Sequence, residues 1–89
     1  MTIRISYQKS FERDLKKMKK REKDLSKFAI FARLIASETT LPEKYREHKL
    51  VGNFKDRWES HLEPDWLVVY KHSEDEVIFE RTGTHSDLF

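Results

Sequence analysis

Three histidines, an aspartate and an arginine in the second half of the chain are the residues best suited to chemistry: His48, His61, Asp65, Arg81 and His85. Histidine exchanges a proton near neutral pH, because its unperturbed pKa is about 6.5. Arginine keeps its charge, and its planar guanidinium group can hold two phosphate oxygens. These residue types therefore favour proton transfer beside a phosphate group.

Four of these five residues flank a predicted β-hairpin. Residues 66–71 (WLVVYK) are rich in β-branched and aromatic side chains, and residues 77–82 begin with three more, Val77, Ile78 and Phe79. The run between them, 72–76, is polar throughout, as in a hairpin loop. His61 and Asp65 precede the first strand, and Arg81 and His85 lie at the end of the second. The hairpin therefore gathers them at its open end.

The rest of the chain supplies one more strand at each side of two helices. Residues 3–7 alternate as in a strand, and the spacing of Phe11, Leu15 and Met18 predicts an amphipathic helix. Asp24 is a suitable N-cap for a second helix over 25–37. That helix is apolar nearly all round, which favours a core helix over a seat for a partner. Residues 43–56 form a predicted loop carrying His48, and 58–62 a further strand.

This order, β-α-α-β-β-β, predicts a single α+β domain over residues 1–89. Short connections between the last three strands require antiparallel pairing. We therefore expect two N-terminal helices on one face of a small, mainly antiparallel sheet of about four strands. Side chains alternate along a strand, so Arg57 and His61 share one face, and Val77, Phe79 and Arg81 share one face.

Composition excludes several classes of protein. The chain has no cysteine, so disulfides and thiolate metal sites are absent. No apolar run approaches the roughly 20 residues of a membrane span, and we expect a cytoplasmic protein. Residues 9–27 hold nine of the eighteen lysines and arginines against four acids. This segment, with Lys16, Lys19 and Lys20, predicts contact with a polyanion or an acidic partner; the alternative is a solvated helix face.

Three stretches carry a resemblance to a known family: LPEKYREHKLVGNF at 41–54, HLEPDW at 61–66 and ERTGTHSDLF at 80–89. The spacing of their histidines, aspartate and arginine resembles that of the YafQ branch of the RelE-like toxins. These are bacterial endoribonucleases of toxin–antitoxin pairs. The resemblance covers nearly the whole chain, and it implies a RelE-like fold.

The resemblance also implies roles for the residues of the opening set. His85 would be the leading proton-transfer residue, with Asp65 as its partner or as a second acid–base group. His48 and His61 would come next, in proton transfer or phosphate contact. Arg81 would be an electrostatic clamp on the charge that develops at the phosphate. No metal or other cofactor is implied.

Aromatic and basic side chains complete the expected RNA site. Trp66 and Phe89 would shape the site or stack on a base, although a tryptophan in a strand is ordinarily core. The family commonly has an arginine three residues before the first histidine of the HxxPDW motif, where this chain has Trp58. Arg57 lies one residue earlier and so faces the other way. It remains a candidate RNA contact without inheriting the family role.

The resemblance implies an mRNA endoribonuclease that acts by metal-independent attack of the ribose 2′-hydroxyl. The partners that it implies are mRNA on the ribosome and an acidic antitoxin of the DinJ or RelB kind. Such an antitoxin has a ribbon-helix-helix N-terminus, so DNA would be contacted only through it. One alternative is a non-catalytic RNA- or ribosome-binding module on the same fold. Another is a metal-dependent hydrolase using His48, His61, His85 and Asp65, but their spacing fits no compact ligand signature.

Overall fold

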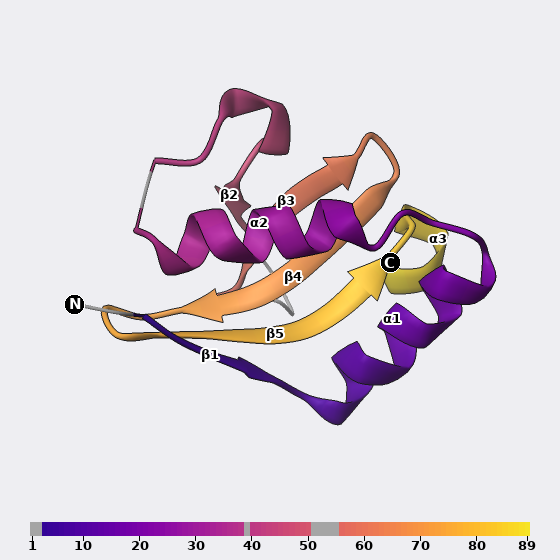
Figure 1. Cartoon of the computed structure of the whole chain (residues 1–89), viewed down its shortest axis with the longest axis horizontal. Coiled ribbons are helices and arrows are strands. Elements are labelled where there is room, and N and C mark those ends of the chain that lie inside the picture. The colour runs from indigo at the N-terminus through magenta and orange to yellow at the C-terminus, as the bar shows by residue number, and fades with distance from the viewer. Residues whose placement is uncertain (1–2, 39, 51–55) are drawn as a thin grey trace.

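The computed structural model describes residues 3–38, 40–50 and 56–89. A five-stranded sheet with the order β1-β5-β4-β3-β2 forms its centre (Figure 1). The strands are β1 (Arg4–Tyr7), β2 (His48–Lys49), β3 (Trp58–Glu63), β4 (Trp66–His72) and β5 (Glu76–Gly83). The helices are α1 (Lys9–Lys20), α2 (Ser26–Ala36), the 3-10 turn η1 (Glu43–Tyr45) and α3 (His85–Leu88).

The predicted α+β fold is confirmed, with one strand more than expected. β3, β4 and β5 pair antiparallel, as their short connections require, while β1 pairs parallel with β5. The additional strand is β2, which lies within the predicted loop and pairs with β3. It has two residues, too few to show an alternating pattern. Residues 51–55 of that predicted loop lie outside the described residues.

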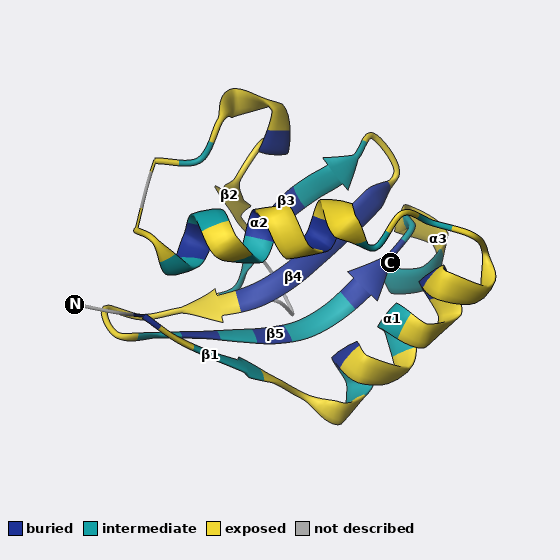
Figure 2. Ribbon diagram, viewed as in Figure 1, coloured by how far each residue is buried: buried dark blue, intermediate teal, exposed yellow. Residues whose placement is uncertain are grey.

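An aromatic cluster joins the helices to the sheet. Phe11 of α1, Phe28 of α2 and Phe79 of β5 have ring centroids 5.0–5.4 Å apart. α2 contributes one buried face only: Phe28, Phe31 and Ile35 are buried, but Ile30 is 51% exposed. The expectation of a core helix therefore holds for one side of α2 (Figure 2).

α1 also closes the edge of β5 where β1 ends. β1 stops at Tyr7, opposite Phe79. Beyond this point Ser10 Oγ donates to the backbone oxygen of Glu80 at 2.7 Å, and Asp14 Oδ2 accepts from the backbone N–H of Thr82 at 3.2 Å. Side chains of α1 thus satisfy backbone groups that an exposed sheet edge would leave unpaired.

A β-bulge in β5 changes the direction of Arg81. Tyr70 pairs with Phe79, but the next residue along β4, Val69, pairs with Arg81, so Glu80 is the extra residue. Cross-strand partners share a face, and one inserted residue reverses the alternation that follows it. Phe79 lies in the core beneath the helices, so Arg81 belongs to the opposite face. The expectation that Val77, Phe79 and Arg81 share a face is therefore wrong.

α3 follows β5 through a tight connection. Gly83 has φ +155°, and a Cβ there would lie 2.9 Å from Cβ and Oδ2 of Asp87, so another residue would be strained as well as crowded. Thr84 and Asp87 form a capping box at the start of α3. Asp87 also pairs with Arg21, just past the end of α1, at 2.6 Å. The C-terminal turn is thus fixed to both β5 and α1.

Candidate active site

The structure brings three of the predicted residues into a row. The imidazole centroids of His48 and His61 are 6.1 Å apart, and those of His61 and His85 are 6.0 Å apart. The three come from β2, β3 and the first residue of α3. Groups at this separation can each reach an atom of one phosphodiester placed between them, since a proton-transfer contact spans about 2.6–3.2 Å.

Asp65 holds the ring of His85. Its Oδ1 lies 2.6 Å from Nδ1 of His85 and accepts the backbone N–H of the same residue at 2.9 Å. The pKa of Asp65 lies below its usual range, chiefly because of the backbone N–H and then because of the ring. Both side chains are more than half exposed. Nε2 of His85 has no hydrogen bond or ion pair to the residues that the structure describes, and is therefore the ring nitrogen open to a substrate.

Glu59 is a member of the site that sequence reasoning missed. Its Oε1 lies 3.3 Å from Nε2 of His48 and 3.5 Å from Nε2 of His61. The residue is 5% exposed, so its carboxylate is a buried group beneath two rings. A signal was present in the sequence, because Glu59 precedes His61 by two residues and so shares its strand face. Because a charged residue in a strand is usually exposed to solvent, Glu59 was not predicted as a site residue.

The opposite ring nitrogens of these histidines face backbone oxygens. Nδ1 of His48 lies 2.7 Å from the oxygen of Arg46, and Nδ1 of His61 lies 3.4 Å from the oxygen of Pro64. A carbonyl accepts only, so Nδ1 carries the proton in such a contact. In a ring with a single proton, Nε2 therefore carries a lone pair, which faces the carboxylate of Glu59. A second proton on the ring, or a bound cation, would turn this contact into an attractive one.

Among the residues that the structure describes, His48, Glu59 and His61 form a group that could hold a metal ion. Their three ligand atoms lie within 4.8 Å of one another. Imidazole and carboxylate are ligands of zinc and copper. This trio differs from the set weighed in the sequence, because Glu59 takes the place of Asp65 and His85.

Both predicted arginines are engaged with carboxylates. Arg81 reaches Asp14 of α1 with Nε at 2.5 Å and Nη2 at 3.4 Å. This contact raises the pKa of Arg81 and fixes the side chain, which remains 38% exposed. Arg57 pairs with Glu80, the bulged residue of β5, at 2.5 Å. Arg81 is therefore a positioned cation rather than a freely moving one.

The two predicted aromatic contacts have opposite environments. Trp66 is fully buried, and its Nε1–H donates to Thr82 Oγ1 at 2.9 Å. A buried ring cannot stack on a base, so the expectation that Trp66 contacts RNA is corrected: it is a core residue that supports the end of the hairpin. Phe89 is 58% exposed, and its backbone N–H donates to the oxygen of His85 at 2.9 Å. It is the one of the two that a base could reach.

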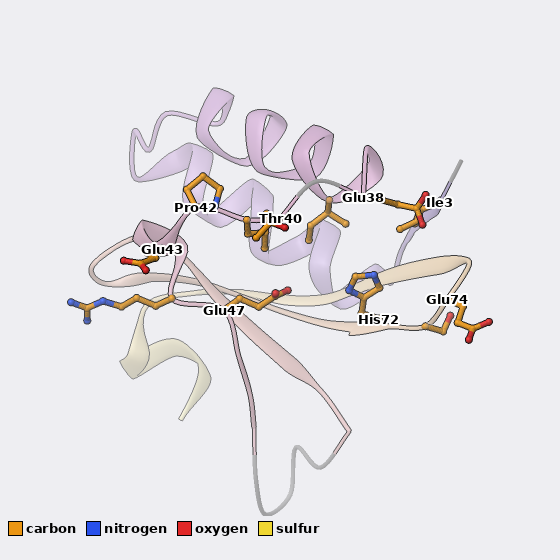
Figure 3. Close-up of a pocket in the computed structure, with 12 residues that line it drawn as sticks. Ile3, Glu38, Thr40, Pro42, Glu43, Glu47, His72 and Glu74 are labelled. Atoms are coloured by element: carbon orange, nitrogen blue, oxygen red, sulfur yellow. The ribbon is translucent and has the colours of Figure 1, made fainter. Parts of the chain in front are cut away.

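The basic residues of α1 lie on its outer side. Lys16, Lys19 and Lys20 are all exposed, and none forms an ion pair with a residue that the structure describes. His72 is the last residue of β4 rather than a loop residue, and it is exposed. It lines a pocket with Glu38, Glu47 and Glu74 (Figure 3), and none of His48, His61 and His85 belongs to that lining.

Residues 3–89 match the YafQ family, which is described as a bacterial toxin of a type II toxin–antitoxin system. The chain belongs to the YafQ family. The chain is similar to the mRNA interferase toxin YafQ of Escherichia coli K12, at 40% identity over 86 residues that cover 96% of this chain and 94% of the relative. The resemblance inferred from the sequence motifs is thus confirmed.

Solved structures agree on the fold. The Escherichia coli DinJ–YafQ toxin–antitoxin complex matches with a TM-score of 0.92 and 37% identity, over 100% of this chain and 99% of that one. A copper-bound mutant toxin from Helicobacter pylori matches with a TM-score of 0.91 and 31% identity, over 98% and 99%. Within the described ranges, no helix has the length and apolar character to cross a membrane.

Proposed function

We propose that this YafQ-family toxin is an mRNA endoribonuclease. One observation carries the proposal: His48, His61 and His85 form a row of rings about 6 Å apart, and Asp65 fixes the outermost ring. Cleaving RNA without a metal needs a base, an acid and a cation near one phosphate. Histidines and a positioned arginine supply these functions.

The reaction follows from the chemistry of the groups. A histidine removes the proton of the ribose 2′-hydroxyl, and the 2′-oxygen attacks the adjacent phosphorus. The bond from phosphorus to the 5′-oxygen breaks, and a protonated histidine donates a proton to that oxygen. The products are a 2′,3′-cyclic phosphate and a 5′-hydroxyl, so the proton taken and the proton given balance.

Within this scheme His85 is the leading proton-transfer residue. Its Nε2 is open to substrate, while Asp65 orients the ring through Nδ1. His61 stands 6.0 Å away as the second acid–base group, with His48 beyond it. Glu59 stabilises positive charge on both rings from a buried position. Arg81, fixed by Asp14, offers charge to the phosphate from the same face of the sheet.

Partners follow from the family and from charge. The toxin acts on mRNA at the ribosome in the cytoplasm and is silenced by an acidic antitoxin. Its Escherichia coli relative forms a toxin–antitoxin complex with DinJ. It contacts DNA only through that antitoxin. The exposed lysines of α1, Lys16, Lys19 and Lys20, face RNA or the antitoxin. A module that only binds RNA would not need three aligned histidines with two carboxylates, and this favours the enzyme.

The trio of His48, Glu59 and His61 supports a second property, binding of copper or zinc. A related toxin is copper-bound, and the ligand atoms here lie within 4.8 Å of one another. A metal would occupy the nitrogens that exchange protons, so it inhibits the reaction. We expect cleavage of naked RNA to persist in excess chelator and to fall when copper is added. A rate restored only by zinc or manganese after chelation would contradict this.

The direct test is cleavage of a defined mRNA by the purified toxin, on translating ribosomes and as naked RNA. The expected new ends are a 2′,3′-cyclic phosphate and a 5′-hydroxyl, read by end-specific ligation and primer extension. Binding to ribosomes without new RNA ends would support the non-catalytic alternative. A 5′-phosphate end would exclude attack by the 2′-hydroxyl.

A further inference from the structure

A groove of about 500 Å³ runs from α2 and η1 to the row of histidines. Its apolar lining includes Ile30 of α2, Tyr45 of η1 and Pro64 of the turn after β3. Ile30 is 51% exposed there, although it is a large apolar side chain. His61 belongs to this lining as well as to the row of rings. The groove and the candidate site are therefore continuous at His61.

Cations dominate the rim of this groove. Lys27, Lys44 and Arg46 line it, against one carboxylate, that of Glu63. Glu63 accepts from Lys27 and also from Lys23, each at 2.8 Å, and these contacts hold its pKa below the usual range. Its negative charge is thus offset by two lysines.

Lys44 and Arg46 are the two rim cations without a carboxylate partner in the parts of the chain that the structure describes. Both are exposed. The ammonium group of Lys44 lies over the ring of Tyr45, 5.3 Å from its centroid. The backbone oxygen of Arg46 holds Nδ1 of His48 at 2.7 Å. Two cations without an ion pair to the described residues therefore line the groove that reaches His61.

We propose that this groove binds the single-stranded RNA that continues from the cleaved phosphate on one side. This inference rests on the proposed endoribonuclease function and extends it to a substrate subsite. Lys44 and Arg46 contact backbone phosphates, and Ile30 with Pro64 forms an apolar surface for a base. Single-stranded RNA is bound in this way, by a cationic track beside surfaces on which bases pack.

Continuity with His61 favours RNA over an acidic antitoxin segment as the occupant. A strand held at His61 has to leave the site over a neighbouring surface, and this groove begins there. The exposed lysines of α1, by contrast, are not part of its lining. Lys44 and Arg46 are therefore positioning residues for the substrate.

The test compares the double variant Lys44→Gln/Arg46→Gln with a control, Arg4→Gln/Lys71→Gln. The control also removes one lysine and one arginine, from exposed positions on β4 and β1. Single-turnover cleavage on programmed ribosomes gives a maximal rate and a half-saturating toxin concentration. Fluorescence anisotropy gives Kd for a short 2′-O-methyl RNA that cannot be cut. Thermal unfolding reports that each variant is folded.

For the groove variant we expect an unchanged maximal rate and, at low salt, a half-saturating concentration and an RNA Kd that rise about tenfold. Loss of two phosphate contacts should also lower the slope of log Kd against log salt concentration by about 1.4, because each contact on a single strand contributes about 0.7 to that slope. The control should match wild type. Two further mRNAs are truncated, one upstream and one downstream of the cut. The half-saturating concentrations of the groove variant and wild type should become equal on one of these mRNAs and stay different on the other.

Equal Kd and half-saturation for the two variants would overturn the inference. So would a difference that persists on both truncated mRNAs, because the groove would then contact ribosomal RNA. A loss confined to antitoxin binding would assign the groove to the antitoxin instead. Failure of the wild-type protein to cut any RNA would overturn the proposed function, while the anisotropy comparison would still decide whether the groove binds RNA.

Discussion

Asp65 holds His85 at two atoms through a single carboxylate oxygen, 2.6 Å from ring Nδ1 and 2.9 Å from the backbone nitrogen. One oxygen therefore fixes both the position of the residue and the orientation of its ring. His85 is the first residue of a four-residue helix, so this contact joins the C-terminal turn to the turn between β3 and β4.

This geometry makes Asp65 a positioning residue, and two substitutions test that role. Asp65→Asn keeps an oxygen that accepts from both nitrogens, whereas Asp65→Ala keeps none. We expect the alanine variant to lose about 10²-fold in cleavage rate and the asparagine variant to recover much of that loss. Single-turnover rates on one mRNA measure both. Equal losses would mean that the carboxylate itself transfers the proton.

Trp66 and Phe89 separate stability from RNA contact. Trp66→Phe removes a buried N–H that donates to Thr82, so we expect it to lower the free energy of unfolding by about 1–3 kcal/mol. Phe89→Ala alters an exposed ring and should weaken RNA binding with little change in stability. Urea unfolding and RNA anisotropy check each variant. Weaker RNA binding by folded Trp66→Phe alone would reverse these assignments.

Acid should loosen the C-terminal turn through Asp87. Arg21 and then the backbone N–H of Thr84 hold the pKa of Asp87 well below its usual range. A depressed folded-state pKa gives stability that is present above the unfolded value of about 3.9 and is lost as pH falls below it. Wild type should therefore be more stable than Asp87→Asn at pH 7, with a gap that narrows as pH falls below about 4 and closes only as pH falls through the depressed folded-state pKa. Urea midpoints across this range test it, and a constant gap would contradict it.

Glu59 should control the response to copper. Glu59→Gln replaces the carboxylate of the trio with a weaker ligand, so inhibition by copper should need a much higher metal concentration. Glu63→Gln is a suitable control, because Glu63 lies on the same strand outside the trio. Cleavage of naked RNA over a copper titration gives the inhibition constants. Equal constants for the two variants would place the metal elsewhere.

The sequence predicted the elements well, because apolar spacing marks α1 and β-branched and aromatic residues mark β4 and β5. The sequence also predicted that His61, Asp65 and His85 lie close together, because the pairing of the hairpin strands brings them to the same end of the sheet. Other features depend on tertiary contacts. The bulge at Glu80 that turns Arg81 leaves no composition signal, and Asp14 is its partner 67 positions away. Glu59 looks like a solvated strand residue until β2 brings His48 beside it.

The central claim is that His85 transfers a proton during cleavage, and His72 provides its matched control. Both are exposed histidines near the ends of long strands, but His72 lies outside the row of rings. The decisive measurement is the single-turnover cleavage rate of one mRNA by wild type, His85→Ala and His72→Ala. We predict a loss of about 10²–10⁴ for His85→Ala and a rate within about twofold of wild type for His72→Ala. Equal rates for the two variants would contradict the account.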